Sequence, residues 1–118
     1  MVFVFYAPAR SEPLLANDSF AQEYEVLGNL LSQVKDRASA LYYRDRIAAE
    51  IEYLHTRQQA GEVAYRQLSP VEQQNFVLRF QQNQFHCGVI TRVHSDARRL
   101  LLNPDAAEVL HDLITHIP

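Results

Sequence analysis

The residues most able to do chemistry lie together in the stretch QNQFHCGVITRVHSD, which runs from Gln82 to Asp96. It contains the only cysteine of the chain, Cys87, and two histidines, His86 and His94. Thiolate and imidazole groups are common zinc ligands, and they also form nucleophile–base pairs in covalent catalysis. The spacing of the three residues decides which of these uses is open to them.

A single metal ion cannot reach both histidines of this stretch. Eight residues separate His86 from His94 by roughly 26 Å in a strand and by about 12 Å in a helix. His111 and His116 lie five residues apart, which does not place them on one face of a helix. The C-x-x-C and H-E-x-x-H spacings of zinc sites are absent from the sequence. We therefore predict no metal site and no cofactor.

Catalysis by Cys87 would need a base within hydrogen-bond reach and a third group that orients this base. His86 is adjacent in sequence, and adjacent residues rarely turn their side chains toward each other. A free cysteine usually packs as a small apolar residue. We therefore predict that the protein is not an enzyme. A small enzyme with His86 and Cys87 in its pocket remains an alternative.

Two groups of carboxylates could in principle share acid–base work. One is the pair Glu50 and Glu52. The other is spaced three and four residues apart on one helix face and consists of Asp105, Glu108 and Asp112. Because acidic residues are favoured near a helix N-terminus, we interpret the second group as a solvated acidic face.

A stripe of tyrosine and arginine is the feature most typical of a binding surface. Tyr42, Arg46, Tyr53 and Arg57, with Ala49 between them, recur at steps of 4, 3, 4 and 4 residues. Tyrosine and arginine are enriched at the centres of protein interfaces. We predict that these four residues bind a partner protein. In the alternative interpretation the tyrosines line the edge of the core, and Arg46 pairs with Glu50 one turn later.

Nucleic acid is not an expected partner, because the net charge is −3 and the sequence lacks a long basic run. Arg92, Arg98 and Arg99 form the best basic cluster and could contact phosphates, so a nucleic-acid-associated regulator is the first alternative function. The segment QLSPVEQQNFVLRF resembles the start of the helix that precedes a helix-turn-helix in some transcription factor domains. The turn and polar recognition helix that should follow are absent, and a helix cap explains the match.

The elements that carry these residues are mostly helical. Residues 1–118 are the length of a single domain. Residues 1–18 read as an N-terminal strand, Val2–Tyr6, and an extended connector through Pro8 and Pro13. An apolar stripe at helical spacing then runs through Phe20, Tyr24, Leu27, Leu31, Val34, Ala38 and Leu41. It could serve as the seam of a homodimer.

The stripe then changes register, which allows one long helix over residues 20–60 or two helices. We favour a break near Lys35–Ser39, with Asp36 or Ser39 as the cap, because an unbroken helix would span roughly 60 Å. Gly28 indicates a close approach of another helix. We expect Gly61 to end this helical region, and we expect a short helical piece over residues 62–68.

The remaining elements have clearer boundaries. Ser69, Pro70 and Glu72 form a capping box that begins a helix to about Gln82. Residues 85–93 are ambiguous between a strand and a helix, and their β-branched content favours a strand that could pair with Val2–Tyr6. Ser95 should cap a short helix, and Asn103 the last one.

The predicted fold is therefore mainly α, a small helical bundle of four to five helices, with a minor two-stranded β element at about residues 2–6 and 86–93. One cysteine and no apolar run long enough to cross a bilayer favour a cytoplasmic protein without a membrane anchor. The predicted function is a non-enzymatic protein–protein interaction module, an adaptor, inhibitor or regulatory subunit that acts through a helix face.

Overall fold

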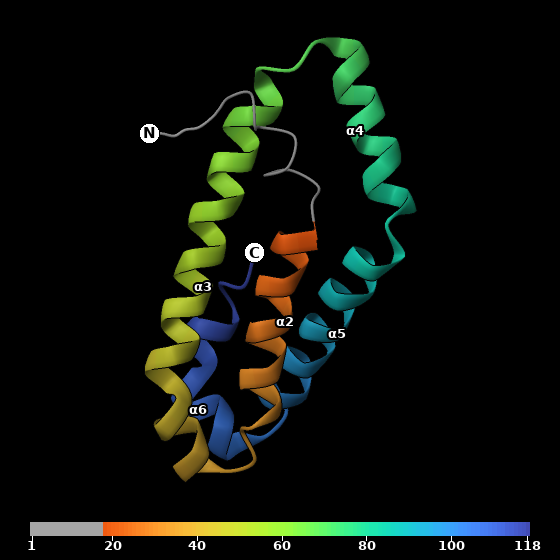
Figure 1. Ribbon diagram of the computed structural model, residues 1–118. Coiled ribbons are helices and arrows are strands. Elements are labelled where there is room, and N and C mark those ends of the chain that lie inside the picture. Colours follow the sequence, from red (N-terminus) through yellow and green to blue (C-terminus); the bar gives the residue numbers. More distant parts are fainter. Residues whose placement is uncertain (1–17) are drawn as a thin grey trace.

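The computed structural model describes residues 18–118, except the side chains of residues 18–20 and 84–86. Within this range the chain forms five helices, α2 (Asp18–Ser32), α3 (Arg37–Arg66), α4 (Pro70–Gln82), α5 (Gln84–Leu101) and α6 (Pro104–Ile114). Helices α2 and α6 each pack between α3 and α5, and α4 links the far ends of α3 and α5 (Figure 1). The predicted helical bundle is confirmed.

The break between α2 and α3 falls where the sequence predicts it. Asp36 is the N-cap of α3, since its carboxylate accepts the backbone N–H of Ser39 at 2.9 Å. In return the Ser39 hydroxyl accepts the backbone N–H of Asp36 at 3.1 Å. This reciprocal cap ends the first helical stripe and turns the chain back on itself.

The apolar stripe of α2 is used inside one chain. Its members from Tyr24 to Val34 are buried in the core, whereas Ala38 and Leu41 on α3 are exposed. The stripe residues from Tyr24 to Val34 therefore cannot contact a second copy of the chain without unpacking the core. The homodimer seam expected over Phe20–Leu41 is thus not an exposed surface in this part.

Helix α3 is longer than the sequence suggests. It passes through Gly61 without ending and reaches Arg66, with Gln67 as its C-cap. The separate helical piece expected over residues 62–68 is the end of α3. Gly61 is buried, so it acts as a small residue on a packed helix face and not as the terminating residue of a helix.

The capping signals of the two later helices are confirmed. Ser69 and Glu72 exchange side chain to backbone hydrogen bonds of 3.2 Å and 2.9 Å, and Pro70 occupies the first turn of α4. Asn103 caps α6 by accepting the backbone N–H groups of Asp105 and Ala106. Each cap satisfies amide groups that the helix itself leaves unpaired.

The strand predicted over residues 85–93 is wrong, because these residues belong to α5. Ser95 accordingly lies inside α5 and caps no helix. The buried positions of α5 recur at helical steps, and they are Val89, Val93, Ala97 and Leu100. This amphipathic periodicity outweighs the local β preference of valine, isoleucine and threonine. The predicted partner strand, Val2–Tyr6, lies outside the described residues.

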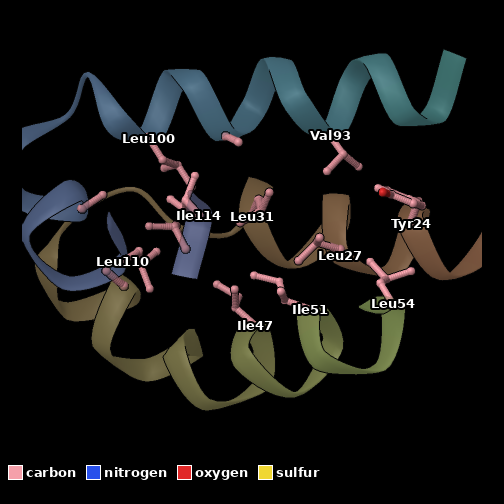
Figure 2. Packing of buried hydrophobic residues seen from close by; sticks show 14 of the residues in the cluster. Tyr24, Leu27, Leu31, Ile47, Ile51, Leu54, Val93, Leu100, Leu110 and Ile114 are labelled. Atoms are coloured by element: carbon pink, nitrogen blue, oxygen red, sulfur yellow. The ribbon is translucent and has the colours of Figure 1, made fainter. Parts of the chain in front are cut away.

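The core fills the space enclosed by α2, α3, α5 and α6 (Figure 2). The largest fully buried side chains come from these four helices and the α2–α3 connection, and they are Leu27, Leu31, Ile47, Leu54, Leu100, Leu110, Val34 and Val93. Gly28 allows α2 to approach α5 closely, because a Cβ atom at Gly28 would lie 3.2 Å from a methyl group of Val93. The predicted close approach is confirmed. Among the described helices, none is long and apolar enough to span a membrane.

Candidate interaction surface on helix α3

The predicted stripe of tyrosine and arginine forms one side of α3, which we call the Tyr/Arg face. Its members are Tyr42, Arg46, Tyr53 and Arg57. At about 100° per residue, the four positions fall within a band of about 60° around the helix axis. The core positions Ile47, Ile51 and Leu54 centre roughly 115° away from the middle of this band. The same helix therefore presents an apolar side to the core and an aromatic, basic side next to it.

Arg46 is held against two aromatic rings at one end of this face. Its guanidinium carbon lies 5.6 Å from the centroid of the Tyr42 ring and 5.4 Å from that of Tyr43. The two rings meet edge to face, with centroids 4.8 Å apart. Tyr42 is 67% exposed, and Arg46 is exposed as well. Cation–π attraction thus fixes a surface guanidinium in place.

Tyr53 and Arg57 form the other end of the face. The guanidinium carbon of Arg57 lies 5.9 Å from the Tyr53 ring centroid, and its Nη1 donates to the Tyr53 hydroxyl at 3.2 Å. Tyr53 is 42% exposed and Arg57 is half-buried. Eleven residues separate Tyr53 from Tyr42, which places the two clusters about 16 Å apart along α3.

The alternative interpretation placed the tyrosines of the stripe at the core edge, but Tyr42 and Tyr53 are both exposed. The neighbouring Tyr43, outside the stripe, lines the core edge, half-buried against the apolar cluster. Its contact with Arg46 was missed, although a spacing of three residues on a helix signals such a contact. The expected pair of Arg46 with Glu50 is not found among the described residues. The Glu50 carboxyl instead hydrogen-bonds Glu23.

Glu50 and Glu23 form a carboxyl pair between α3 and α2 that the sequence did not predict. Burial, together with the hydrogen bond and negative charge of Glu23, raises the pKa of Glu50 to about 7. The Oε2 atom of Glu50 is buried without a hydrogen-bond partner among the described residues. Glu52, its expected companion, is exposed. The closeness of the two carboxyls thus favours the protonated form of Glu50.

The three arginines proposed as phosphate contacts do not share one surface. Arg92 lies 3.4 Å from Glu25, and Arg99 donates to the Leu31 carbonyl at 3.2 Å. Both side chains therefore bind α2. Arg98 is exposed, and it faces about 120° away from Arg92 around the axis of α5.

His86, Cys87 and His94 do not form a catalytic group in the described part of the chain. Cys87 is half-buried, and its Sγ donates to the Phe80 carbonyl at 3.7 Å. His94 shares a helix face with Cys87 but lies about 10 Å along α5, beyond hydrogen-bond reach. The side chain of His86 is not described. Among the described residues, no three His, Cys, Asp or Glu side chains gather as metal ligands.

The acidic group of α6 ties this helix to α3. Glu108 pairs with Arg37. Asp112 accepts two hydrogen bonds from Arg44, at 3.0 Å and 2.8 Å, and these bonds lower the pKa of Asp112 to about 2. Two of the three predicted carboxylates therefore act as ion-pair partners. Asp105 is exposed in the first turn of α6.

A hollow of about 400 Å³ lies along α4. Its lining residues are Glu72, Asn75, Leu78, Arg79 and Gln82. All five of these described lining residues belong to α4. None of these five residues is a candidate site residue predicted from the sequence.

Comparison of the chain with protein-family models, with curated protein sequences and with solved structures gives no significant match.

Proposed function

We propose that this protein is a non-enzymatic protein-interaction module of the cytoplasm, an adaptor, inhibitor or regulatory subunit that binds its partner through the Tyr/Arg face of α3. The supporting observation is the setting of Arg46. This exposed guanidinium stacks on two tyrosine rings, and no carboxylate pairs with it among the described residues.

The other arginines in the first half of α3 provide an internal comparison. Arg37 and Arg44 bind the carboxylates of Glu108 and Asp112 on α6, and they hold the bundle together. Arg46 makes no such contact with the described chain, yet aromatic rings restrict its side chain. A restricted guanidinium loses less conformational entropy when it binds, so its position favours association with a partner.

The composition of the face supports a protein partner. Tyrosine offers a large apolar area with few rotatable bonds, and arginine forms bidentate hydrogen bonds with carboxylates. Ala49 and Thr56, which flank the band on one side, are small or uncharged. A second copy of the chain is one partner that could use this surface, and sedimentation velocity would detect it.

The test compares two variants. One replaces two residues of the Tyr/Arg face, and the other replaces two exposed residues elsewhere. The variant Tyr53→Ala/Arg57→Ala should lose the proteins captured from a lysate of the native host while keeping the helical circular dichroism spectrum and cooperative unfolding. The matched control is Arg98→Ala/Leu102→Ala, at the end of α5 and directly after it, because Arg98 is exposed and Leu102 is 84% exposed. Equal capture by both folded variants would refute the proposed surface.

A further inference from the structure

Helix α4 contacts the rest of the described chain through one side. Gln73 donates to the Tyr65 carbonyl at 3.0 Å, and the ring centroid of Phe76 lies 5.4 Å from that of Tyr65 on α3. The Phe80 ring follows on the same side, 6.0 Å from the Phe76 ring. These three residues of α4 are half-buried, and no residue of α4 is fully buried. Figure 1 shows α4 at the edge of the bundle, so its opposite side points away from the core.

The opposite side of α4 is exposed and carries a stripe at helical spacing. Val71, Asn75, Leu78 and Gln82 recur at steps of 4, 3 and 4 residues, and they fall within a band of about 60° around the helix axis. This band centres roughly 160° away from the half-buried residues. All four residues are exposed, with Val71 at 66% and Leu78 at 50%. We call this surface the outer α4 face. Its spacing is typical of a helix that pairs with another helix.

Matched side chains border the outer α4 face on both edges. Glu72 and Arg79 lie seven residues apart along one edge, and Gln74 and Gln81 lie seven residues apart along the other. All four are exposed. Glu72 and Arg79 also line the hollow along α4. Glu72 caps α4 through its Oε1 atom. A carboxylate accepts several hydrogen bonds and a guanidinium has five donors, so both side chains can make further contacts.

We propose that the outer α4 face binds the same face of a second copy of the chain, with the two helices antiparallel. A two-fold axis midway between Asn75 and Leu78 places Glu72 across from Arg79 of the partner subunit, and Arg79 across from Glu72 of the partner subunit. Two ion pairs then border one edge of the contact.

The same axis orders the rest of the contact. It places Gln74 across from Gln81 of the partner subunit, so that two side-chain amides exchange hydrogen bonds. It also brings the two copies of Leu78 within about 5 Å of each other along the helix direction, where they pack together at the centre. One symmetry operation thus pairs the charged, the amide and the apolar groups.

The charge pattern selects a second copy of the chain as the occupant. In a parallel pair of helices, each Glu72 would face a carboxylate and each Arg79 a guanidinium, and like charges repel. An unrelated partner would need the same charges in reverse order, whereas a second copy supplies them by symmetry. An antiparallel pair of α4 helices is therefore the arrangement in which opposite charges meet.

The contact is limited in size. Helix α4 has 13 residues and spans about 20 Å. A pair of helices of this length covers less than the roughly 800 Å² per partner of a standard stable interface, so dimerisation should depend on concentration. The contact does not use the Tyr/Arg face, because that face lies on α3, and it does not depend on the proposed function.

Sedimentation velocity of the full-length chain tests the dimer. The average sedimentation coefficient should rise between about 10 µM and 1 mM, as expected for a small interface. Leu78→Glu should abolish the rise, because it places two like charges at the centre of the contact. Val63→Glu, at a 54% exposed position of α3, is the matched control and should keep the rise. A monomer at every concentration, or a dimer that survives Leu78→Glu, would overturn the proposal. Loss of the dimer in Tyr53→Ala/Arg57→Ala would place the contact on the Tyr/Arg face, and would overturn it as well.

Charge reversal tests the antiparallel pairing. Glu72→Arg and Arg79→Glu each place like charges across the contact, so each should weaken dimerisation by about tenfold or more. An equimolar mixture of the two variants should dimerise again, because opposite charges then face each other at both ion pairs. Arg79→Lys keeps the charge and should dimerise like the parent chain. All variants should keep the helical circular dichroism spectrum. No recovery in the mixture, or undiminished dimerisation of Arg79→Glu alone, would contradict the antiparallel contact.

Discussion

Two of the three glycines inside the helices, Gly28 and Gly88, have opposite surroundings. Gly28 of α2 faces α5, where a Cβ atom would lie 3.2 Å from Val93 Cγ2. Gly88 of α5 is exposed, and a Cβ atom there would meet no atom within 4 Å. The same substitution, glycine to alanine, should therefore have different effects at the two positions.

Helix propensity alone favours both substitutions by about 1 kcal/mol. Gly88→Ala should gain this amount in full, which raises the melting temperature by about 4 °C for a domain of this size. At Gly28 the added methyl group presses on a fully buried valine, and overpacking of a core contact costs about 1–3 kcal/mol. We expect Gly28→Ala to lose about 1 kcal/mol.

Urea unfolding of the two single variants measures this difference directly. Val93→Ala should relieve the contact, so the effect of Gly28→Ala should become favourable in that background. The resulting coupling energy should be about 1–2 kcal/mol in a double-mutant cycle. Equal stabilisation by Gly28→Ala and Gly88→Ala, with no coupling to Val93, would refute the close packing of α2 on α5.

Three further predictions concern charge and capping. Because the pKa of Glu50 is raised to about 7 from its ordinary 4.5, folding favours its protonated form, and stability falls as the pH rises from 4.5 to 7. Glu50→Gln should raise the free energy of unfolding at pH 8 by about 1 kcal/mol, after allowance for solvent screening, and change it little at pH 4. Equal effects at both pH values would contradict this. The pKa of Asp112 is lowered to about 2 by Arg44, so its contribution is complete above 3.8 and is lost as the pH falls toward 2. In the Asp112→Asn variant, the free energy of unfolding should depend less on pH in that window. An unchanged pH dependence would show that the ion pair does not contribute to stability. Ser69→Ala should remove about 1 kcal/mol from α4, seen as faster amide exchange in its first turn. Unaltered exchange there would argue against the cap.

The local signals in the sequence were sufficient for most helix boundaries. Asp36, Ser69 and Asn103 act through backbone amides a few residues away, so their roles can be read from short spacings. Gly61 and residues 85–93 were misassigned because their state depends on distant packing. The helical state of these segments depends on the burial of Gly61 in α3 and of Val89 and Val93 in the core, and no short sequence motif predicts that burial.

For the candidate site too, contacts within one helix could be predicted from the sequence, and contacts between helices could not. The Tyr/Arg face follows from helix periodicity, so its four residues could be placed together before the fold was known. The pairing of Glu50 with Glu23, and of Arg44 with Asp112, joins residues on different helices. Such contacts depend on how the helices pack against one another, and the spacing within either helix does not specify them.

The most direct test of the proposed surface is site-specific photo-crosslinking from α3. A photoreactive phenylalanine derivative replaces Tyr42, whose ring is largely exposed, and a control chain carries it in place of Leu102, directly after α5. In a lysate of the native host, the Tyr42 position should give a discrete protein adduct that disappears when Arg46→Ala is added, and the Leu102 position should not give it. The same adducts from both positions, or an adduct that persists in the Arg46→Ala chain, would contradict binding through the Tyr/Arg face.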